Sequence, residues 1–247
     1  MRPLTSPELV EFWEQSGSRS TAHWAVALLD AASDDDPGAA AADLTVGERD
    51  RRLMLLRCWL FGPLVSGLAS CAGCGEQLEV TFDLHELIAS AGEAAAGPVT
   101  VRWKGATLSC RAPTTADILA VAADDHADVR RGLIARCVTI SGGAGQRAPG
   151  PRPLAALPAA ALAKVSAALS AADPLADVRL AVTCNECGHR WDTSFDVASF
   201  LWTEISASVE RMLGEVHVLA SAYGWSEAEV LAVGPRRRQF YLEAVGG

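Results

Sequence analysis

Four of the seven cysteines occur in two copies of one short pattern. Residues 71–84 read CAGCGEQLEVTFDL, and residues 184–197 read CNECGHRWDTSFDV. In each copy a C-x-x-C-G turn is followed by a segment with alternating apolar side chains, which predicts a strand. Two such pairs supply four thiolates, the number that a tetrahedral structural zinc ion requires. We therefore predict one Zn²⁺ that joins segments 113 residues apart. The predicted ligands are Cys71, Cys74, Cys184 and Cys187.

Two other interpretations of the paired cysteines are local disulfides and a redox C-x-x-C site. A redox site places its first cysteine at a helix N-terminus within a βαβ unit, whereas here a glycine and a strand follow both pairs. Four thiolates complete a zinc shell, so we expect His189 at the surface or just outside the shell, and a catalytic zinc with an open position is disfavoured. Cys58, Cys110 and Cys137 are expected to be buried small apolar residues.

No catalytic motif accompanies the cysteines. The sequence lacks G-x-S-x-G, H-E-x-x-H, a P-loop and G-x-G-x-x-G. The remaining histidines are scattered on predicted helices without partners at ligand spacing; they are His23, His85, His126 and His217. We therefore expect a protein that is not an enzyme.

Composition restricts the partners. The 247 residues carry a formal net charge of −9, which disfavours nucleic acid because phosphate binding depends on accumulated Lys and Arg. No apolar stretch reaches the roughly 18 residues of a spanning helix, so no membrane span is expected. The N-terminus has no long apolar core followed by a small-residue cleavage site, so it does not resemble a signal peptide. These features predict a cytoplasmic location.

The predicted fold class is α+β, mainly helical, with a small zinc-stapled antiparallel β-ribbon. Thr45 and Glu48 form a capping box that opens a helix to about Leu60, and an apolar stripe predicts a long helix across 205–223. Residues 99–110 read as a β-hairpin that turns at Lys104-Gly105. The expected regions are N-terminal helices (1–65), a zinc-ribbon β region (66–112 and 175–197), a helical insertion (113–174) with a mobile linker (141–153), and C-terminal helices (198–247). A further linker is expected at 34–38.

The C-terminal helices combine aromatic residues with three consecutive arginines. Trp, Tyr and Arg dominate the energetics of protein interfaces, so this block is a candidate partner-binding surface. The alternative is that the aromatic side chains only complete the core. The residues concerned are Trp225, Arg236, Arg237, Arg238, Phe240 and Tyr241.

Beyond these motifs, the chain resembles the zinc-ribbon members of the T-even-type baseplate hub assembly chaperone family, encoded in contractile phage-tail-like injection clusters. The resemblance is carried by VGERDRRLMLLRCWLFGP (46–63), CAGCGEQLEVTFDL, RAPTTADILAV (111–121), DPLADVRLAVTCNECGHRWDTSFDVASFLWTEI (173–205) and EVHVLASAYGWSEAEVLAVGPRRRQFYLE (215–243). The four cysteines and YGWSEAEVL are its most specific parts. Ala72 and Asn185 depart from the pattern, because family members often carry proline there; neither is a ligand position.

The resemblance implies a non-enzymatic baseplate component or hub assembly factor, either cytoplasmic or incorporated in the particle. Its partners would be other baseplate, hub or tube proteins of a contractile tail-like particle. One alternative is a zinc-ribbon regulator that binds nucleic acid, which the acidic charge disfavours. Another is a metal-dependent hydrolase, which the complete thiolate shell disfavours.

Overall fold

The fold is α+β, mainly helical with small antiparallel sheets. The computed structural model describes residues 1–17, 19–33, 40–92, 94–95, 97–124, 128–141 and 157–246. The expected linker at 34–38, His126 and residues 142–153 of the second expected linker lie outside the described residues. Within the described ranges, no helix is both long enough and apolar enough to cross a membrane.

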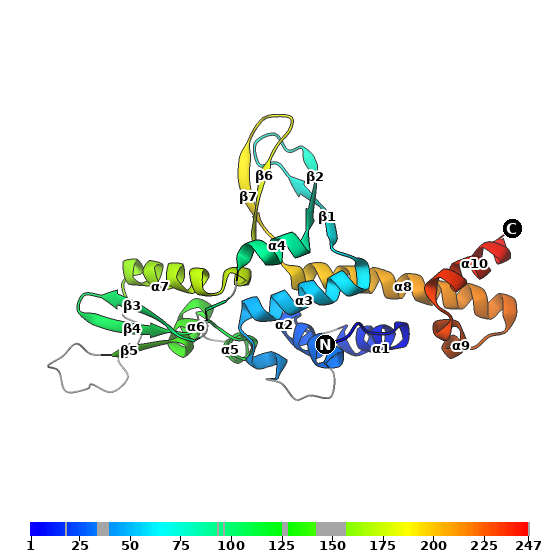
Figure 1. Ribbon diagram of the computed structural model, residues 1–247, viewed down its shortest axis with the longest axis horizontal. Helices are drawn as coiled ribbons and strands as arrows, with labels where there is room; N and C mark the ends of the chain where they lie inside the picture. Colours follow the sequence, from blue (N-terminus) through cyan, green and yellow to red (C-terminus); the bar gives the residue numbers. More distant parts are fainter. Residues whose placement is uncertain are drawn as a thin grey trace.

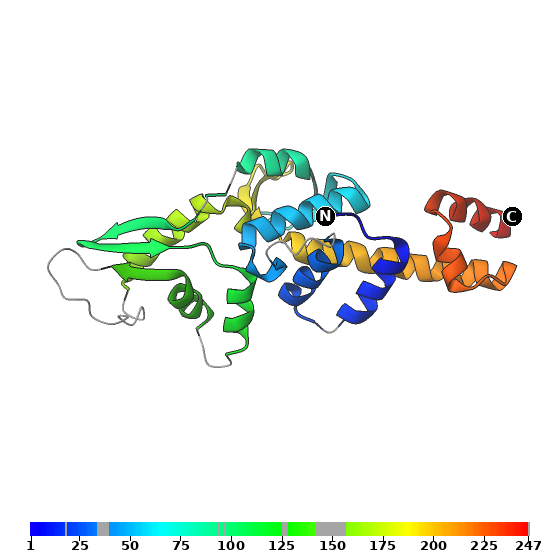
Figure 2. The ribbon, with the colours of Figure 1, turned by 60° about the horizontal axis from the view of Figure 1, so that its bottom comes forward.

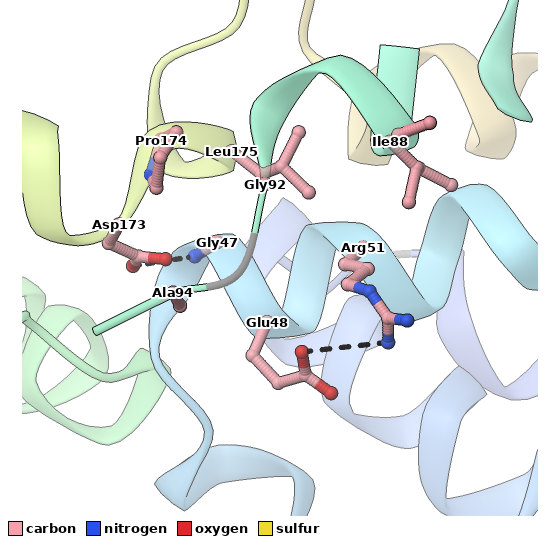
Figure 3. Close-up of a pocket in the computed structure, with 10 residues that line it drawn as sticks. Gly47, Glu48, Arg51, Ile88, Gly92, Ala94, Asp173, Pro174 and Leu175 are labelled. Carbon is pink, nitrogen blue, oxygen red and sulfur yellow. Dashed lines mark hydrogen bonds and ion pairs between the residues drawn. The ribbon is translucent and has the colours of Figure 1, made fainter. Parts of the chain in front are cut away.

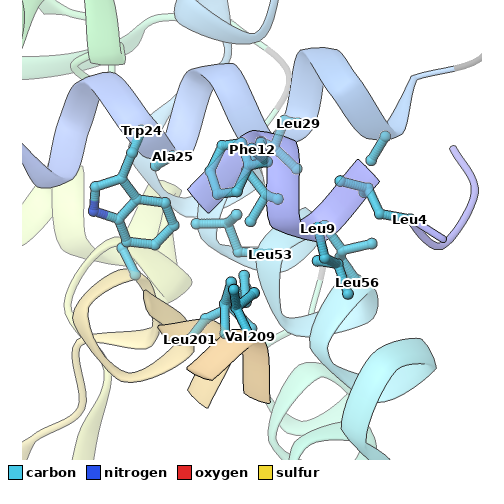
Figure 4. Close-up of a cluster of buried hydrophobic side chains, with 14 of the residues drawn as sticks. Leu4, Leu9, Phe12, Trp24, Ala25, Leu29, Leu53, Leu56, Leu201 and Val209 are labelled. Carbon is cyan, nitrogen blue, oxygen red and sulfur yellow. The ribbon is translucent and has the colours of Figure 1, made fainter. Parts of the chain in front are cut away.

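A helical body surrounds the long helix α8 (Val197–Tyr223). Against it pack α1 (Ser6–Ser16), α2 (Thr21–Ala32) and α3 (Val46–Phe61), with the short 3-10 helix η1 (Ala41–Asp43) beside α2. Figure 4 shows side chains of these helices meeting in one apolar cluster. The predicted stripe on α8 is confirmed except at its last member: Tyr223 is 42% exposed, whereas the other five members face this core. They are Ile205, Val209, Met212, Val216 and Leu219.

Local capping explains where several helices begin. The Thr45 hydroxyl accepts a hydrogen bond from the Glu48 amide at the start of α3, which is one half of the predicted capping box. The Glu48 carboxylate, which would complete the box at the Thr45 amide, instead accepts a hydrogen bond from Arg52 at 2.8 Å. A reciprocal capping box of Ser226 and Glu229 opens α9 (Glu227–Ala232). Between them, α8 ends where Gly224 adopts a left-handed φ of 68°.

Two β-hairpins rise together from the helical body (Figure 1). One is formed by β1 (Leu64–Ser70) and β2 (Gln77–Asp83), and the other by β6 (Arg179–Thr183) and β7 (Arg190–Ser194). The 3-10 helix η3 (Pro174–Ala176) precedes β6. The first hairpin runs directly into α4 (Leu84–Ala91) and the second into α8, and an aspartate caps each helix, Asp83 and Asp196. The repeat therefore comprises strand, cysteine loop, strand, capping aspartate and helix.

A second lobe holds a three-stranded antiparallel sheet in the order β3-β4-β5. Its strands are β3 (Val99–Trp103), β4 (Ala106–Cys110) and β5 (Val138–Ser141), and its helices are α5 (Thr115–Ala122), α6 (Val129–Cys137) and α7 (Ala159–Ala172). The β3–β4 hairpin is confirmed, with its turn at Lys104 and Gly105. The expected single β region over 66–112 is divided between two sheets: β1 and β2 form the first cysteine hairpin, whereas β3 and β4 belong to the sheet that β5 completes by pairing with β4.

The C-terminal helices lie at the far end of α8. There α9 and α10 (Pro235–Gly246) pack on α8, while the β3–β4 hairpin projects from the opposite end of the molecule (Figure 2). The cysteine hairpins stand between these two ends (Figure 1). The elements that carry the candidate metal centre therefore lie on the central body.

Candidate metal centre

The structure brings the four predicted ligands together at the tips of the two hairpins. All four sulfur atoms lie within 4.8 Å of one another. The Sγ atoms of Cys71 and Cys187 are 3.7 Å apart, as are those of Cys74 and Cys184. A tetrahedron with Zn–S bonds of about 2.3 Å has S–S edges of about 3.8 Å, whereas a disulfide requires about 2.05 Å. The cluster therefore fits a four-thiolate metal site. Each 3.7 Å distance joins a cysteine of the first motif to a cysteine of the second.

The two cysteine loops have matching backbones. In each, the amide of the glycine after the second cysteine donates to the carbonyl of the first: Gly75 to Cys71 at 2.9 Å and Gly188 to Cys184 at 3.0 Å. These glycines have φ values of 78° and 70°, a left-handed conformation that other residues adopt with strain. The glycine of C-x-x-C-G is thus required by the turn that directs both sulfurs to one side.

Burial and hydrogen bonding set the acidity of the thiols. Burial alone would raise the pKa of Cys71, but hydrogen bonds from the Cys74 and Gly73 amides and from neighbouring thiols lower that pKa to about 7. At Cys74 the Glu76 amide acts to lower the pKa, while the adjacent thiols raise it to about 12. Metal binding requires thiolates, so loading this site displaces protons.

The two described hairpins form separate sheets, with no backbone hydrogen bonds between them. Contacts between side chains and between the two cysteine loops hold them together. Phe82 and Phe195, identical positions of the repeat, meet edge to face with ring centroids 5.0 Å apart. Near the tip, a Cβ added to Gly73 would lie 3.2 Å from Cβ of His189, so the two loops are in close contact. His189 itself is exposed and stacks on Trp191. A cavity of about 330 Å³ separates the hairpins between these contacts.

The other three cysteines lie away from the cluster. Cys110 and Cys137 are buried in the second lobe, as predicted, and Cys58 on α3 is half-buried. Burial raises the pKa of Cys110 and raises that of Cys137 to about 11. These two thiols therefore stay protonated at neutral pH, and each donates a long hydrogen bond of 3.8 Å, Cys110 to the Leu108 carbonyl and Cys137 to the Asp117 carboxylate.

The C-terminal candidate residues divide into two groups. Trp225 and Tyr241 pack edge to face at 5.2 Å, and Phe240 beside them is 67% exposed. Arg236 and Arg237 are exposed, whereas Arg238 is only 3% exposed. Arg238 donates to the Glu215 carboxylate on α8 at 2.8 Å and to the Val233 carbonyl at 2.7 Å. Arg238 therefore stabilises the packing of α10 on α8 and is not part of the exposed surface.

Another cavity, of about 530 Å³, lies beside the N-terminus of α3 (Figure 3). The buried carboxylate of Asp173 accepts a hydrogen bond from the Gly47 amide at 2.9 Å, and Glu48 pairs with Arg51 at 3.8 Å. A Cβ on Gly47 would meet the Asp173 carboxylate at 1.9 Å, so glycine is required there. The Gly47–Asp173 hydrogen bond therefore joins α3 to the residue that precedes η3, while the Glu48–Arg51 pair lies within α3.

None of the protein-family models, curated proteins or solved structures compared with the chain matches it.

Proposed function

We propose that this protein is a non-enzymatic component or hub assembly factor of the baseplate of a contractile phage-tail-like injection system, acting through protein–protein contacts. The observation that carries a scaffolding role is the set of four thiols at tetrahedral spacing. Such a set leaves a bound metal no open position for substrate, so the metal would stabilise structure. A four-thiolate set suits Zn²⁺ or iron, and we propose Zn²⁺ in a zinc ribbon.

The baseplate assignment is supported by the sequence resemblance and by where its segments fall. The segment at 46–63 forms α3 and leads into the first hairpin. Residues 173–205 form η3, the second hairpin and the start of α8, and 215–243 form the end of α8, α9 and most of α10. The resemblance thus covers the segments that frame the metal centre and the C-terminal helices.

The C-terminal surface is the proposed contact with a neighbouring baseplate subunit. We define it by the exposed residues Tyr223, Arg236, Arg237 and Phe240, with Trp225 and Tyr241 supporting them. Arg236 and Arg237 lie at the N-terminus of α10, where the helix dipole disfavours positive charge. Exposed aromatic rings beside cations are typical of interface hot spots.

The test is to purify the particles from the native host with this chain tagged or deleted. We expect the tagged chain to co-purify with baseplate, hub or tube proteins, and deletion to leave particles without complete baseplates. Normal particles after deletion, together with no baseplate protein captured by the tag, would refute the proposal. Elemental analysis of the purified chain tests the metal separately, with one zinc per chain expected.

A further inference from the structure

The second lobe is basic although the chain is acidic. The described residues of the lobe hold seven Lys and Arg against three Asp, a net charge of +4. The whole sequence 97–172, including its residues outside the described ranges, carries +5, while the whole chain carries −9. The remaining residues therefore carry −14. A charge asymmetry of this size within one chain points to an electrostatic contact.

Both lysines of the sequence converge on one aromatic ring in this lobe. Lys104 lies at the tip of the β3–β4 hairpin and Lys164 lies on α7, and their Nζ atoms are 5.8 and 5.5 Å from the centre of the Trp103 ring. Both ammonium groups are within cation–π range, and they are at most about 11 Å apart. Bringing two like charges together has a cost that an anionic partner would relieve.

The backbone at Lys104 is unusual. Its φ is 44°, and it is the one non-glycine residue with a positive φ in the described part of the chain. Asn, Asp or Gly is the usual occupant of that position in a two-residue hairpin turn with both φ values positive. A lysine there holds its charge at the tip of the β3–β4 hairpin at some conformational cost.

The carboxylates that the structure describes in this lobe form ion pairs only with Arg111 and Arg136. Asp117 accepts hydrogen bonds from Arg111 and Arg136 at 2.5 and 3.1 Å, and Asp128 caps α6. Within the described ranges, several cations of the lobe have no carboxylate within ion-pair distance. They are Arg102, Lys104, Arg130, Arg131 and Lys164.

We propose that the tip of this lobe, around Lys104, Lys164 and Trp103, is a docking surface for an acidic protein surface. Charge complementarity selects the partner: carboxylates would pair with the two ammonium groups that Trp103 holds in place. Nucleic acid fits less well, because the ring is covered by ammonium groups and packs on the lobe core, so it is no free platform for a base. The −14 on the rest of the chain would also repel an extended polyanion. The surface lies at the opposite end of the molecule from the C-terminal surface (Figure 2) and does not depend on the identity of the particle.

The probe is poly-L-glutamate, with binding measured by biolayer interferometry at low and at physiological salt. We expect binding that weakens with salt and falls roughly fivefold in the double variant K104E/K164E, as expected for the loss of two exposed ion pairs. The matched control is R19E/R211E, which changes the net charge equally at exposed arginines outside the lobe. Equal losses in the two variants, or tighter binding to a short DNA duplex than to poly-L-glutamate, would overturn the proposal.

A second measurement needs no variant. Because Lys104 and Lys164 are the only lysines, carbodiimide coupling of poly-L-glutamate to the folded wild-type chain reports on this surface directly. Mass spectrometry should find the adducts on these two residues, and prior acetylation of the amines should weaken salt-sensitive binding. Adducts confined to the N-terminal amine, or binding unchanged by acetylation, would show that the surface is not used.

Discussion

Replacing one cysteine of the cluster should cost far more stability than replacing an equally buried cysteine elsewhere. Cys184 is 1% exposed and Cys110 is 0% exposed, so serine at either position buries a hydroxyl in place of a thiol. That substitution costs about 1–3 kcal/mol when the hydroxyl lacks a partner. Cys184→Ser also removes a metal ligand, whereas Cys110→Ser does not. The difference between the two variants therefore isolates the contribution of the metal.

The size of that difference follows from linkage. A metal that binds only the folded chain stabilises it by about 4 kcal/mol when its free concentration is 1,000 times the dissociation constant. Thermal and urea unfolding of the two variants and the wild type, all with zinc present, would measure it. EDTA should lower the stability of the wild type and Cys110→Ser, and should leave Cys184→Ser almost unchanged. Equal losses in the two variants, or an EDTA effect that persists in Cys184→Ser, would refute a shared four-cysteine site.

Three further predictions concern the metal, the body and the C-terminal surface. Zinc should be released as the pH falls, because protons compete with the metal for the thiolates. A chromogenic chelator would measure the zinc released at each pH, and retention that does not depend on pH would contradict thiolate ligation. Arg57→Ala should lower the free energy of unfolding by about 3 kcal/mol, because the buried guanidinium pairs with Glu204 and donates to the carbonyls of Gly62 and Leu64. A thermal melt with no change in stability would contradict this prediction. R236E/R237E should keep or slightly raise the melting temperature, because acidic residues suit the N-terminus of α10, but should reduce particle assembly; unchanged assembly would count against the surface.

The cysteine cluster and the helix starts could be predicted because their signals are local. C-x-x-C-G specifies a turn with two sulfurs on one side, and T-x-x-E or S-x-x-E specifies a helix start within one turn. The repeat of the pattern then indicated which distant segments meet. Metal identity and the baseplate role stay predictions.

The strand β1 was not predicted, because LVSGLAS has neither strict apolar alternation nor a run of β-branched residues. Its pairing with β2 is imposed by the turn between them, with Ser70 opposite Gln77 across the cysteine loop. The strand β5 was missed for a related reason: VTIS is only four residues long, and its partner β4 lies about 30 residues earlier. The burial of Arg238 also required tertiary information, because its partner Glu215 lies 23 residues away on α8.

The metal centre gains its structural importance from what the two hairpins connect. The first hairpin leaves the C-terminus of α3, and the second runs directly into α8. At the base, Arg57 on α3 pairs with Glu204 on α8 and bonds the Leu64 carbonyl at the start of β1. The two sheets share no backbone hydrogen bonds. A metal would therefore hold the hairpins together at their tips, while the Arg57–Glu204 ion pair and the Phe82–Phe195 contact hold them together nearer the helical body. Loss of the metal would then loosen the hairpins first while the α3–α8 core, held by its own buried leucines, remains packed.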